Sequence, residues 1–250
     1  MKNLGVLILF TLLFFAVAAN ASSNTIYFYG GDLDLNDPNQ NGLANENDAY
    51  VPGPMLAFPD GAATYQNFVV SGSGIKVTGL FTNNLSDLSP YAAFWDIRSG
   101  VSSGNGGTVI AGGLAFGGNF THAPTGRSDF GYIEYKDWAA GLNVNLAPGT
   151  YWFAVVPLDA NRFGRSFNSN TDGLNAVGTQ ISNLQYFNSA FFHANFLNAN
   201  TQGVFSTFSS GVYDDPLYGE SVPEPSSLVL LGSGLVGVAG LVRRRRHGVT

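Results

Sequence analysis

The chain of 250 residues has no cysteine and few charges, with 11 Lys or Arg and 17 Asp or Glu. The lack of cysteine excludes disulfide bonds, thiol nucleophiles and cysteine-ligated zinc or iron–sulfur clusters. The net charge is −6, and five of the basic residues lie at the two ends, at position 2 and positions 243–246. This distribution argues against a phosphate-binding surface, so the composition predicts a protein that binds no nucleic acid.

Residues typical of exposed helices are also scarce in the middle of the chain. Positions 22–221 contain three Glu and two Lys, against 26 Gly and 22 Asn. Glu and Lys are the usual residues of exposed helix faces, so long surface helices are not expected. The chain nevertheless has 20 Phe, 11 Tyr and 3 Trp, which is too aromatic for a disordered polypeptide and predicts a packed core.

Short runs of β-branched and aromatic residues, bounded by Gly, Asn, Pro and Ser, recur through this region and are typical of strands. The predicted strands are 25–29, 63–70, 75–82, 92–98, 108–111, 130–138, 142–146, 150–156, 187–196 and 204–208. The run at 150–156 is too apolar to be half exposed and should be central. About ten strands separated by turns predict one all-β domain over residues 22–221, an antiparallel two-sheet sandwich of the jelly-roll type.

The N-terminus has the pattern of an export signal. Lys2 precedes an uncharged apolar run from Leu4 to Ala18, and the small residues Ala19 and Ala21 follow. This order predicts a secretory signal peptide over residues 1–21, cleaved by signal peptidase after Ala21. The alternative, a retained membrane helix, is disfavoured because the run is short.

The C-terminus has the pattern of a membrane span. Residues 226–242 carry no charge. As a helix, positions 228–242 cover roughly 22 Å of a hydrocarbon core of about 30 Å. This helix is short for a membrane span, but it is lengthened by Ser226 and Ser227 and by arginine side chains that can reach the membrane surface. We therefore predict a transmembrane helix over 226–242 and a cytoplasmic tail over 243–250, held inside by Arg243, Arg244, Arg245 and Arg246.

A Pro-X-Pro element stands just before this span, at Pro223, Glu224 and Pro225 within residues 222–225. Such an element joins neither a helix nor a central strand, so it should be extended and accessible. With the short span and the arginines, it resembles the PEP-CTERM sorting signal of exported bacterial proteins. The resemblance implies cleavage by an exosortase, a membrane transpeptidase, and an association with exopolysaccharide and the cell envelope. It makes these three residues a substrate motif.

Catalytic motifs are present only in unfavourable contexts. The stretch from Gly100 to Gly104 fits the nucleophile pattern G-x-S-x-G, with Ser102 as nucleophile and His122 or His193 as a downstream base. That pattern needs a strand, a sharp turn and a helix. Here Asn-Gly-Gly and another strand follow, so a hairpin loop is predicted instead.

The acidic residues do not form a catalytic pair by their spacing. On a strand, Glu134 points away from Asp129 and Asp137, so the three should not act together in glycoside hydrolysis. Asp214 and Asp215 are expected in a solvated turn near the membrane. The sequence therefore predicts no catalytic residue and no enzymatic activity.

One loop is similar to an EF-hand-like calcium loop. Residues 37–48 offer oxygen side chains at loop positions 1, 3, 5, 9 and 12, with Gly42 at position 6. Position 12 is Asp48 where a bidentate Glu is usual, and no helices flank the loop. A solvated Asn-rich loop is favoured, so no metal or cofactor is predicted, and calcium binding stays a hypothesis.

Trp138, in a polar context, is the tryptophan expected to face the surface.

Together these patterns predict a non-enzymatic protein of the cell surface or extracellular matrix. It would be anchored in the inner membrane during processing by exosortase and then be displayed or released. The alternative is a secreted β-sandwich module that binds exopolysaccharide, with calcium assistance as a further hypothesis.

Overall fold

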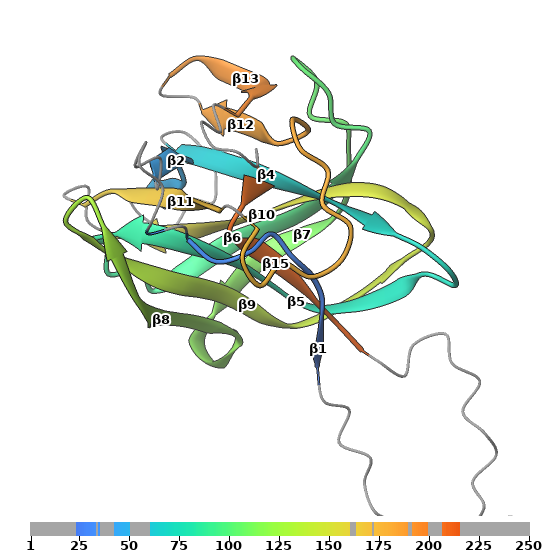
Figure 1. Ribbon diagram of the computed structural model, residues 1–250, viewed down its shortest axis with the longest axis horizontal. Coiled ribbons are helices and arrows are strands. Elements are labelled where there is room, and N and C mark those ends of the chain that lie inside the picture. The colour runs from blue at the N-terminus through green and yellow to red at the C-terminus, as the bar shows by residue number, and fades with distance from the viewer. Residues whose placement is uncertain are drawn as a thin grey trace, which may run out of the picture. The chain divides into compact units, whose positions relative to one another are not determined.

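The computed structural model describes residues 24–33, 35, 43–50, 61–160, 164–171, 173–189, 192–199 and 207–215. These residues form strands and one short 3-10 helix, arranged in two sheets (Figure 1). The prediction of an all-β, two-sheet body is thereby confirmed, and Asn24–Tyr218 forms one compact unit. No helix in the described ranges is long and apolar enough to cross a membrane. The predicted signal peptide, Pro-Glu-Pro motif, transmembrane helix and arginine tail all lie outside those ranges.

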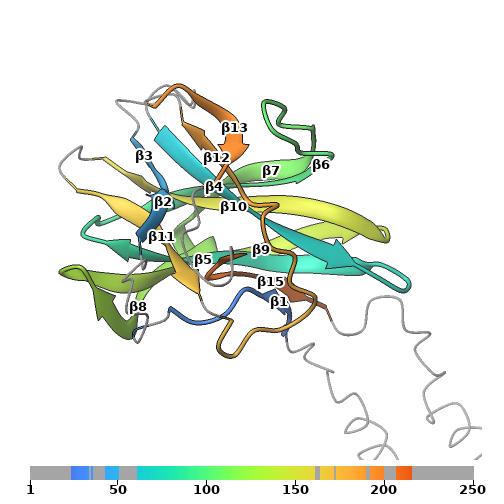
Figure 2. The same ribbon diagram turned by 45° about the horizontal axis from the view of Figure 1, so that its top comes forward.

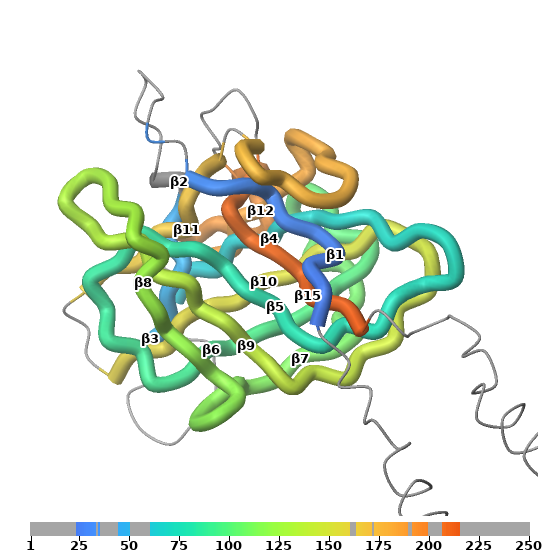
Figure 3. The backbone as a smooth tube through the Cα atoms, turned by 60° about the horizontal axis from the view of Figure 1, so that its bottom comes forward, coloured from blue at the N-terminus to red at the C-terminus, as the bar shows by residue number. Residues whose placement is uncertain are grey.

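The first sheet joins the two ends of the described chain. Its order is β1 (Thr25–Tyr29), β15 (Ser210–Asp214), β5 (Ile75–Ser86), β11 (Ser166–Thr171) and β14 (Thr207–Phe208). In addition, β2 (Leu43–Glu46) pairs with β11, and β9 (Tyr132–Leu146) pairs with both β5 and β8 (Phe120–Asp129). The first and last described strands, β1 and β15, therefore run side by side, as Figure 3 shows.

The second sheet lies over the first. Its order is β13 (Ala194–Asn198), β12 (Tyr186–Ser189), β4 (Gly61–Val70), β3 (Asp48–Tyr50), β10 (Gly149–Asp159), β6 (Ala92–Ser99) and β7 (Thr108–Phe116). Among the described strands, β3 and β10 pair in parallel over two residues, and the other pairings are antiparallel. The short 3-10 helix η1 (Gly117–Asn119) links β7 to β8.

Apolar side chains of the two sheets form a core between them. Figure 2 shows the ribbons of β4, β6, β7 and β10 above those of β5, β9 and β15. Phe28 and Leu80 from the first sheet pack in one cluster with Phe68, Ile97 and Phe153 from the second. The rings of Phe68 and Phe153 meet edge to face, with their centroids 5.6 Å apart, which is a favourable aromatic geometry. The two sheets therefore pack face to face through side chains of alternate residues.

Part of the other face of the second sheet is buried as well. Trp152, Ala154 and Val156 of β10 lie in a second cluster with Tyr186 and Phe196, which come from the β12–β13 hairpin. Because alternate residues of β10 pack on opposite faces, this strand is buried throughout most of its length. The prediction that this segment is central is confirmed.

Several strand boundaries differ from the prediction. Residues 130–138 and 142–146 belong to one strand, β9, because the pairing with β5 shifts register near Gly141, which has φ +70°. Residues 187–196 divide into β12 and β13, with a turn at His193, where φ is +50°. Strands β2, β3, β8, β11 and β15 were not predicted.

Strand β11 shows why such elements escape prediction. Its sequence is Ser-Phe-Asn-Ser-Asn-Thr, yet five of its six residues are buried. The Asn168 amide donates to Thr64 Oγ1 at 2.7 Å and to Ser210 Oγ at 3.2 Å. Asparagine and serine favour turns when they compete for the backbone locally, whereas here side chains distant in sequence satisfy them.

The buried carboxyl of Asp48 should make stability depend on pH. Its Oδ2 accepts a hydrogen bond from the Ser166 amide at 3.1 Å. Burial, with the nearby Glu46 carboxylate, raises the pKa of Asp48 from 3.8 to about 7. An acid whose pKa rises on folding favours the folded state less as pH increases, so stability falls from about pH 4 to pH 7 and is then constant.

We therefore expect Asp48→Asn to raise the free energy of unfolding by up to about 4 kcal/mol at pH 8, the linkage of a pKa that moves from 3.8 to about 7, and to leave it unchanged near pH 4. Asparagine keeps an acceptor for the Ser166 amide and removes the charge. Urea unfolding of both proteins at the two pH values measures the difference. An equal difference at both pH values would contradict the assignment.

Candidate binding site

A pocket of about 240 Å³ lies on the outer face of the second sheet, where β4, β6, β7 and β10 run side by side. Cross-strand register arranges its floor in two rows. One row is apolar, since Phe94 pairs with Leu114 on one side and with Val156 on the other. In the neighbouring row, Asp96 pairs with Gly112 and with Ala154.

The small residues beside Asp96 create the space. A Cβ added at Gly112 would lie 3.0 Å from the Asp96 Cβ and 3.1 Å from the Trp95 carbonyl oxygen, closer than ordinary van der Waals contact. Ala154 on the other side carries only a methyl group. A carboxyl group is thus placed between two short neighbours, and the lining consists of Tyr65, Phe94, Trp95, Asp96, Gly112, Gly113, Leu114, Ala154 and Val156.

Arg98 holds the Asp96 carboxylate in place. Its Nε donates to Asp96 Oδ2 at 2.6 Å, and its Nη1 donates to the Gly106 carbonyl at 3.1 Å. Its guanidinium carbon lies 5.4 Å from the Tyr65 ring centroid and 5.2 Å from that of Phe196. Both distances are within the range of cation–π attraction, so Arg98 is fixed by charge, hydrogen bonds and two rings.

The second oxygen of Asp96 is unsatisfied. Tyr65 donates its hydroxyl to Asp96 Oδ2 at 3.3 Å, whereas Asp96 Oδ1 is buried and has no hydrogen-bond partner. Burial raises the pKa of Asp96, while the charge and hydrogen bonds of Arg98 and the Tyr65 hydroxyl oppose the rise. Buried polar atoms are normally paired, so this oxygen is equipped to accept a hydrogen bond from a bound molecule.

Hydrogen bonds beside Arg98 tie β13 to the β6–β7 loop. The Gly104 amide donates to the Phe196 carbonyl at 3.2 Å, and the Asn195 amide group donates to the Gly104 carbonyl at 3.1 Å. Phe196 adopts φ +46°, a left-handed conformation that is costly for a residue other than glycine. This conformation accompanies the contact between the Phe196 ring and Arg98.

The same loop accounts for the nucleophile-like motif. Ser102 forms an isolated bridge with Asn105 at the tip of the β6–β7 hairpin, and the next element after this loop is strand β7, with no helix between them. His122 lies on β8 and His193 in the turn before β13. The structure therefore places the three residues on different elements, and the prediction of a hairpin loop is confirmed.

Glu134 and Asp137 pack on opposite faces of β9. Glu134 Oε2 accepts from Arg127 Nε at 2.5 Å and from Thr125 Oγ1 at 2.6 Å. Asp137 Oδ1 lies 2.7 Å from His122 Nδ1, and the His122 ring stacks on Tyr135 at 4.1 Å. Both carboxyl groups are fully buried, and Asp129 lies at the end of β8.

The expectation for Asp214 and Asp215 was wrong. Asp214 ends β15, and its Oδ1 accepts from the Lys76 amide at 3.0 Å. Asp215 Oδ2 lies 3.5 Å from Lys76 Nζ. The two acids connect β15 to β5, because the pairing of these strands brings the end of β15 next to Lys76.

The calcium-like loop is described only at its end. The residues at its first three oxygen-bearing positions, Asp37, Asn39 and Asn41, lie outside the described residues. Glu46 Oε1 contacts Arg165 Nη1 at 2.5 Å, and Asp48 accepts from the Ser166 amide. Within the ranges that the structure describes, no group of three or more His, Asp or Glu is arranged to hold a metal ion.

Trp138 is half-buried on the outer side of the first sheet, where its ring centroid lies 5.4 Å from that of Tyr213.

The sequence patterns did not predict that Asp96, Arg98, Tyr65 and Gly112 belong to a site. The Asp-x-Arg spacing places Asp96 and Arg98 on one face of a strand and was available as a signal. The other residues reach the pocket only through strand pairing.

Comparison with protein families identifies the C-terminus. The model of the PEP-CTERM protein-sorting motif matches residues 221–246, which contain Pro223, Glu224, Pro225 and the four arginines. No curated protein and no solved structure matches the chain. The motif implies an exported protein that an exosortase processes and that is sorted to the cell surface. The chain thus carries a PEP-CTERM sorting motif behind a mostly β-sheet body.

Proposed function

We propose that the protein is a non-enzymatic component of the cell surface or extracellular matrix. Its β-sheet body is carried outward behind the signal peptide, held by the C-terminal span, and separated from that span by an exosortase. The observation that carries this proposal is the match of residues 221–246 to the sorting motif. Its three parts, the Pro-Glu-Pro element, the uncharged stretch and the arginines, occur there in the required order.

The engagement of the acidic side chains supports a non-enzymatic role. Glu134 is bound by Arg127 and Thr125, and Asp137 is bound by His122 and Asn84. Catalytic carboxyl groups need access to a substrate, whereas both of these are fully buried. They act as anchors of the strands that surround them.

Replacing Pro223 and Pro225 together by alanine should block processing. The wild-type protein is expected to be released with a C-terminus near residue 223, whereas the double variant should stay in the membrane with its arginine tail. Intact mass and cell fractionation measure both outcomes. Pro216→Ala, which lies outside the matched residues 221–246, is the control and should be processed normally. Wild-type protein that retains residues 226–250 would overturn the proposal.

A second candidate function is the binding of a saccharide by the exported body. The pocket beside Asp96 favours it, because it combines aromatic and aliphatic walls with one unsatisfied carboxylate oxygen. Small-ligand sites typically have this composition of mostly apolar lining and a few placed polar groups. On this proposal, surface display brings the pocket to the polysaccharide that surrounds the cell.

A further inference from the structure

We propose that the pocket on the outer face of the second sheet binds a single neutral, hydroxyl-bearing ring, of the kind found in a sugar residue, with one hydroxyl donating to Asp96 Oδ1. This inference rests on the second proposed function, saccharide binding. It adds the site, the charge and the size of the ligand. Four features of the pocket lead to it.

The first feature is the missing hydrogen bond. Asp96 Oδ1 is buried without a partner, although Oδ2 of the same carboxylate accepts from both Arg98 and Tyr65. An unsatisfied buried acceptor destabilises a protein, and a donor on a ligand removes that penalty. A hydroxyl group supplies such a donor, and an aliphatic ligand does not.

The second feature is charge balance. The Asp96 carboxylate lies 2.6 Å from Arg98 Nε, so the pair has no net charge. A cationic ligand would compete with Arg98 for the carboxylate, and an anionic ligand would approach Asp96 itself. Because desolvating an unpaired charge is costly, the site favours a neutral ligand over a charged analogue of the same shape.

The third feature is size. The volume of about 240 Å³ is below the roughly 300–1,000 Å³ of sites for drug-sized ligands. It suits one ring, and the rest of a polymer would remain outside. The row of Phe94, Leu114 and Val156 offers an apolar wall to the carbon face of such a ring, as aromatic and aliphatic side chains do in ligand sites.

The fourth feature is that the polar group is held before any ligand arrives. Arg98 lies against the neighbouring rings of Tyr65 and Phe196 and donates to the Gly106 carbonyl. The backbone of Phe196 is left-handed at φ +46° and is bonded to Gly104. A preorganised acceptor loses little entropy on binding, so a small ligand can be held by few contacts.

The test is calorimetric titration of the full chain in a zwitterionic, sugar-free detergent. The probes are methyl glycosides of glucose, galactose and mannose, with glucuronate and glucosamine as charged counterparts. At least one neutral glycoside is expected to bind, and at least tenfold more tightly than the charged probes. Asp96→Asn and Gly112→Ala should each weaken that binding at least fivefold.

Gly118→Ala is the matched control, because a Cβ there has open space within 4 Å; it should bind like the wild type. Thermal unfolding shows whether each variant is folded, and Gly112→Ala keeps the Asp96–Arg98 pair if Asp96→Asn does not fold. Equal binding by wild type and both pocket variants would overturn this site while leaving saccharide binding intact. A preference for a charged probe would overturn the neutral ligand.

Binding of no glycoside would also overturn the inference. Gels cast with the exopolysaccharide of the producing cells then separate the two proposals. Slower migration of the wild-type protein in those gels would retain polysaccharide binding at another surface, and unchanged migration would remove that function as well. The sorting function is measured by release of the protein and is unaffected by either result.

Discussion

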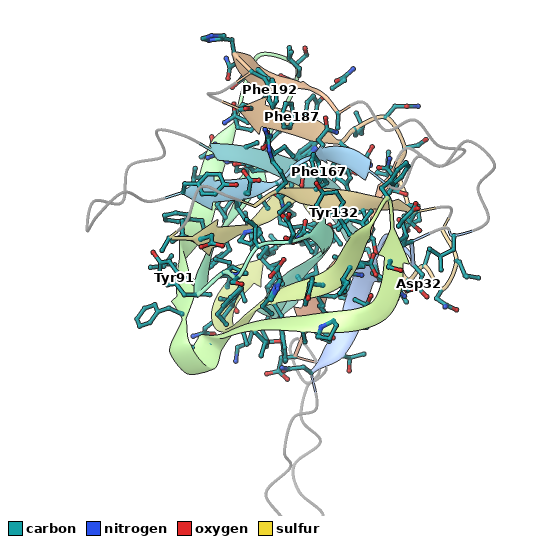
Figure 4. All side chains as sticks on the ribbon, turned by 90° about the vertical axis from the view of Figure 1, so that its left-hand side faces the viewer. Asp32, Tyr91, Tyr132, Phe167, Phe187 and Phe192 are labelled. Carbon is teal, nitrogen blue, oxygen red and sulfur yellow. The ribbon has the colours of Figure 1, made fainter. Side chains whose placement is uncertain are left out.

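Arg127→Ala is expected to lower the free energy of unfolding by about 3–5 kcal/mol, because it leaves the buried carboxylate of Glu134 without a counter-charge. Arg127 Nε lies 2.5 Å from Glu134 Oε2, and Arg127 Nη1 lies 2.7 Å from Asp32 Oδ1. The Glu134 side chain is fully buried, and that of Arg127 is 23% exposed. Arg127 therefore connects β8, β9 and the segment after β1, where Figure 4 labels Asp32.

Urea unfolding of the wild type and the variant measures this difference. Arg165→Ala is a matched control, because Arg165 also pairs with a glutamate, Glu46, but its side chain is 50% exposed. The Glu46 side chain is 10% exposed, so this pair is more open to solvent than Arg127–Glu134, and Arg165→Ala should destabilise the protein clearly less than Arg127→Ala. The double variant Arg127→Ala with Glu134→Gln should recover part of the loss, since the uncompensated charge is gone. Equal effects of Arg127→Ala and Arg165→Ala would refute the argument.

Asn84→Ala should destabilise the protein by about 2–4 kcal/mol, because it breaks a buried polar chain between the two sheets. The Asn84 amide group donates to Asp137 Oδ2 at 2.7 Å and to Thr82 Oγ1 at 3.0 Å. Its oxygen accepts from Asn47 Nδ2 at 3.0 Å, and Asn47 also donates to the Val155 carbonyl at 2.9 Å. Removing Asn84 leaves both Asp137 and Asn47 short of a partner in the interior.

The measurement is again urea unfolding, with Asn143→Ala as control. Asn143 is an exposed asparagine on strand β9, and its replacement should change stability by less than about 0.5 kcal/mol. A double-mutant cycle with Asn47→Ala should give a coupling energy of at least about 1 kcal/mol. Additive effects of the two substitutions would show that the chain does not act as a unit.

These two networks also show which features of the structure could be predicted from the sequence and which could not. Glu134 was correctly predicted to point away from Asp137, since alternation along a strand requires only local geometry. The sequence did not predict that both carboxyl groups are buried. Their partners Arg127, His122 and Asn84 reach them only through the pairing of β9 with β8 and β5. Polar segments such as β11 were missed for the same reason: their hydrogen-bond partners are distant in sequence.

The amino-acid sequence by itself determined the all-β class and the C-terminal sorting motif. Strand class follows from local composition and alternation, and a sorting motif is a linear feature whose parts need only stand in order. The tertiary structure decided the candidate binding site. Asp96 faces Gly112 only because β6 pairs with β7, and Tyr65 reaches the same pocket from β4. A pocket on a sheet is formed only when several strands pair in the correct register. Because this register depends on contacts across the whole sheet, local sequence patterns could not predict the pocket.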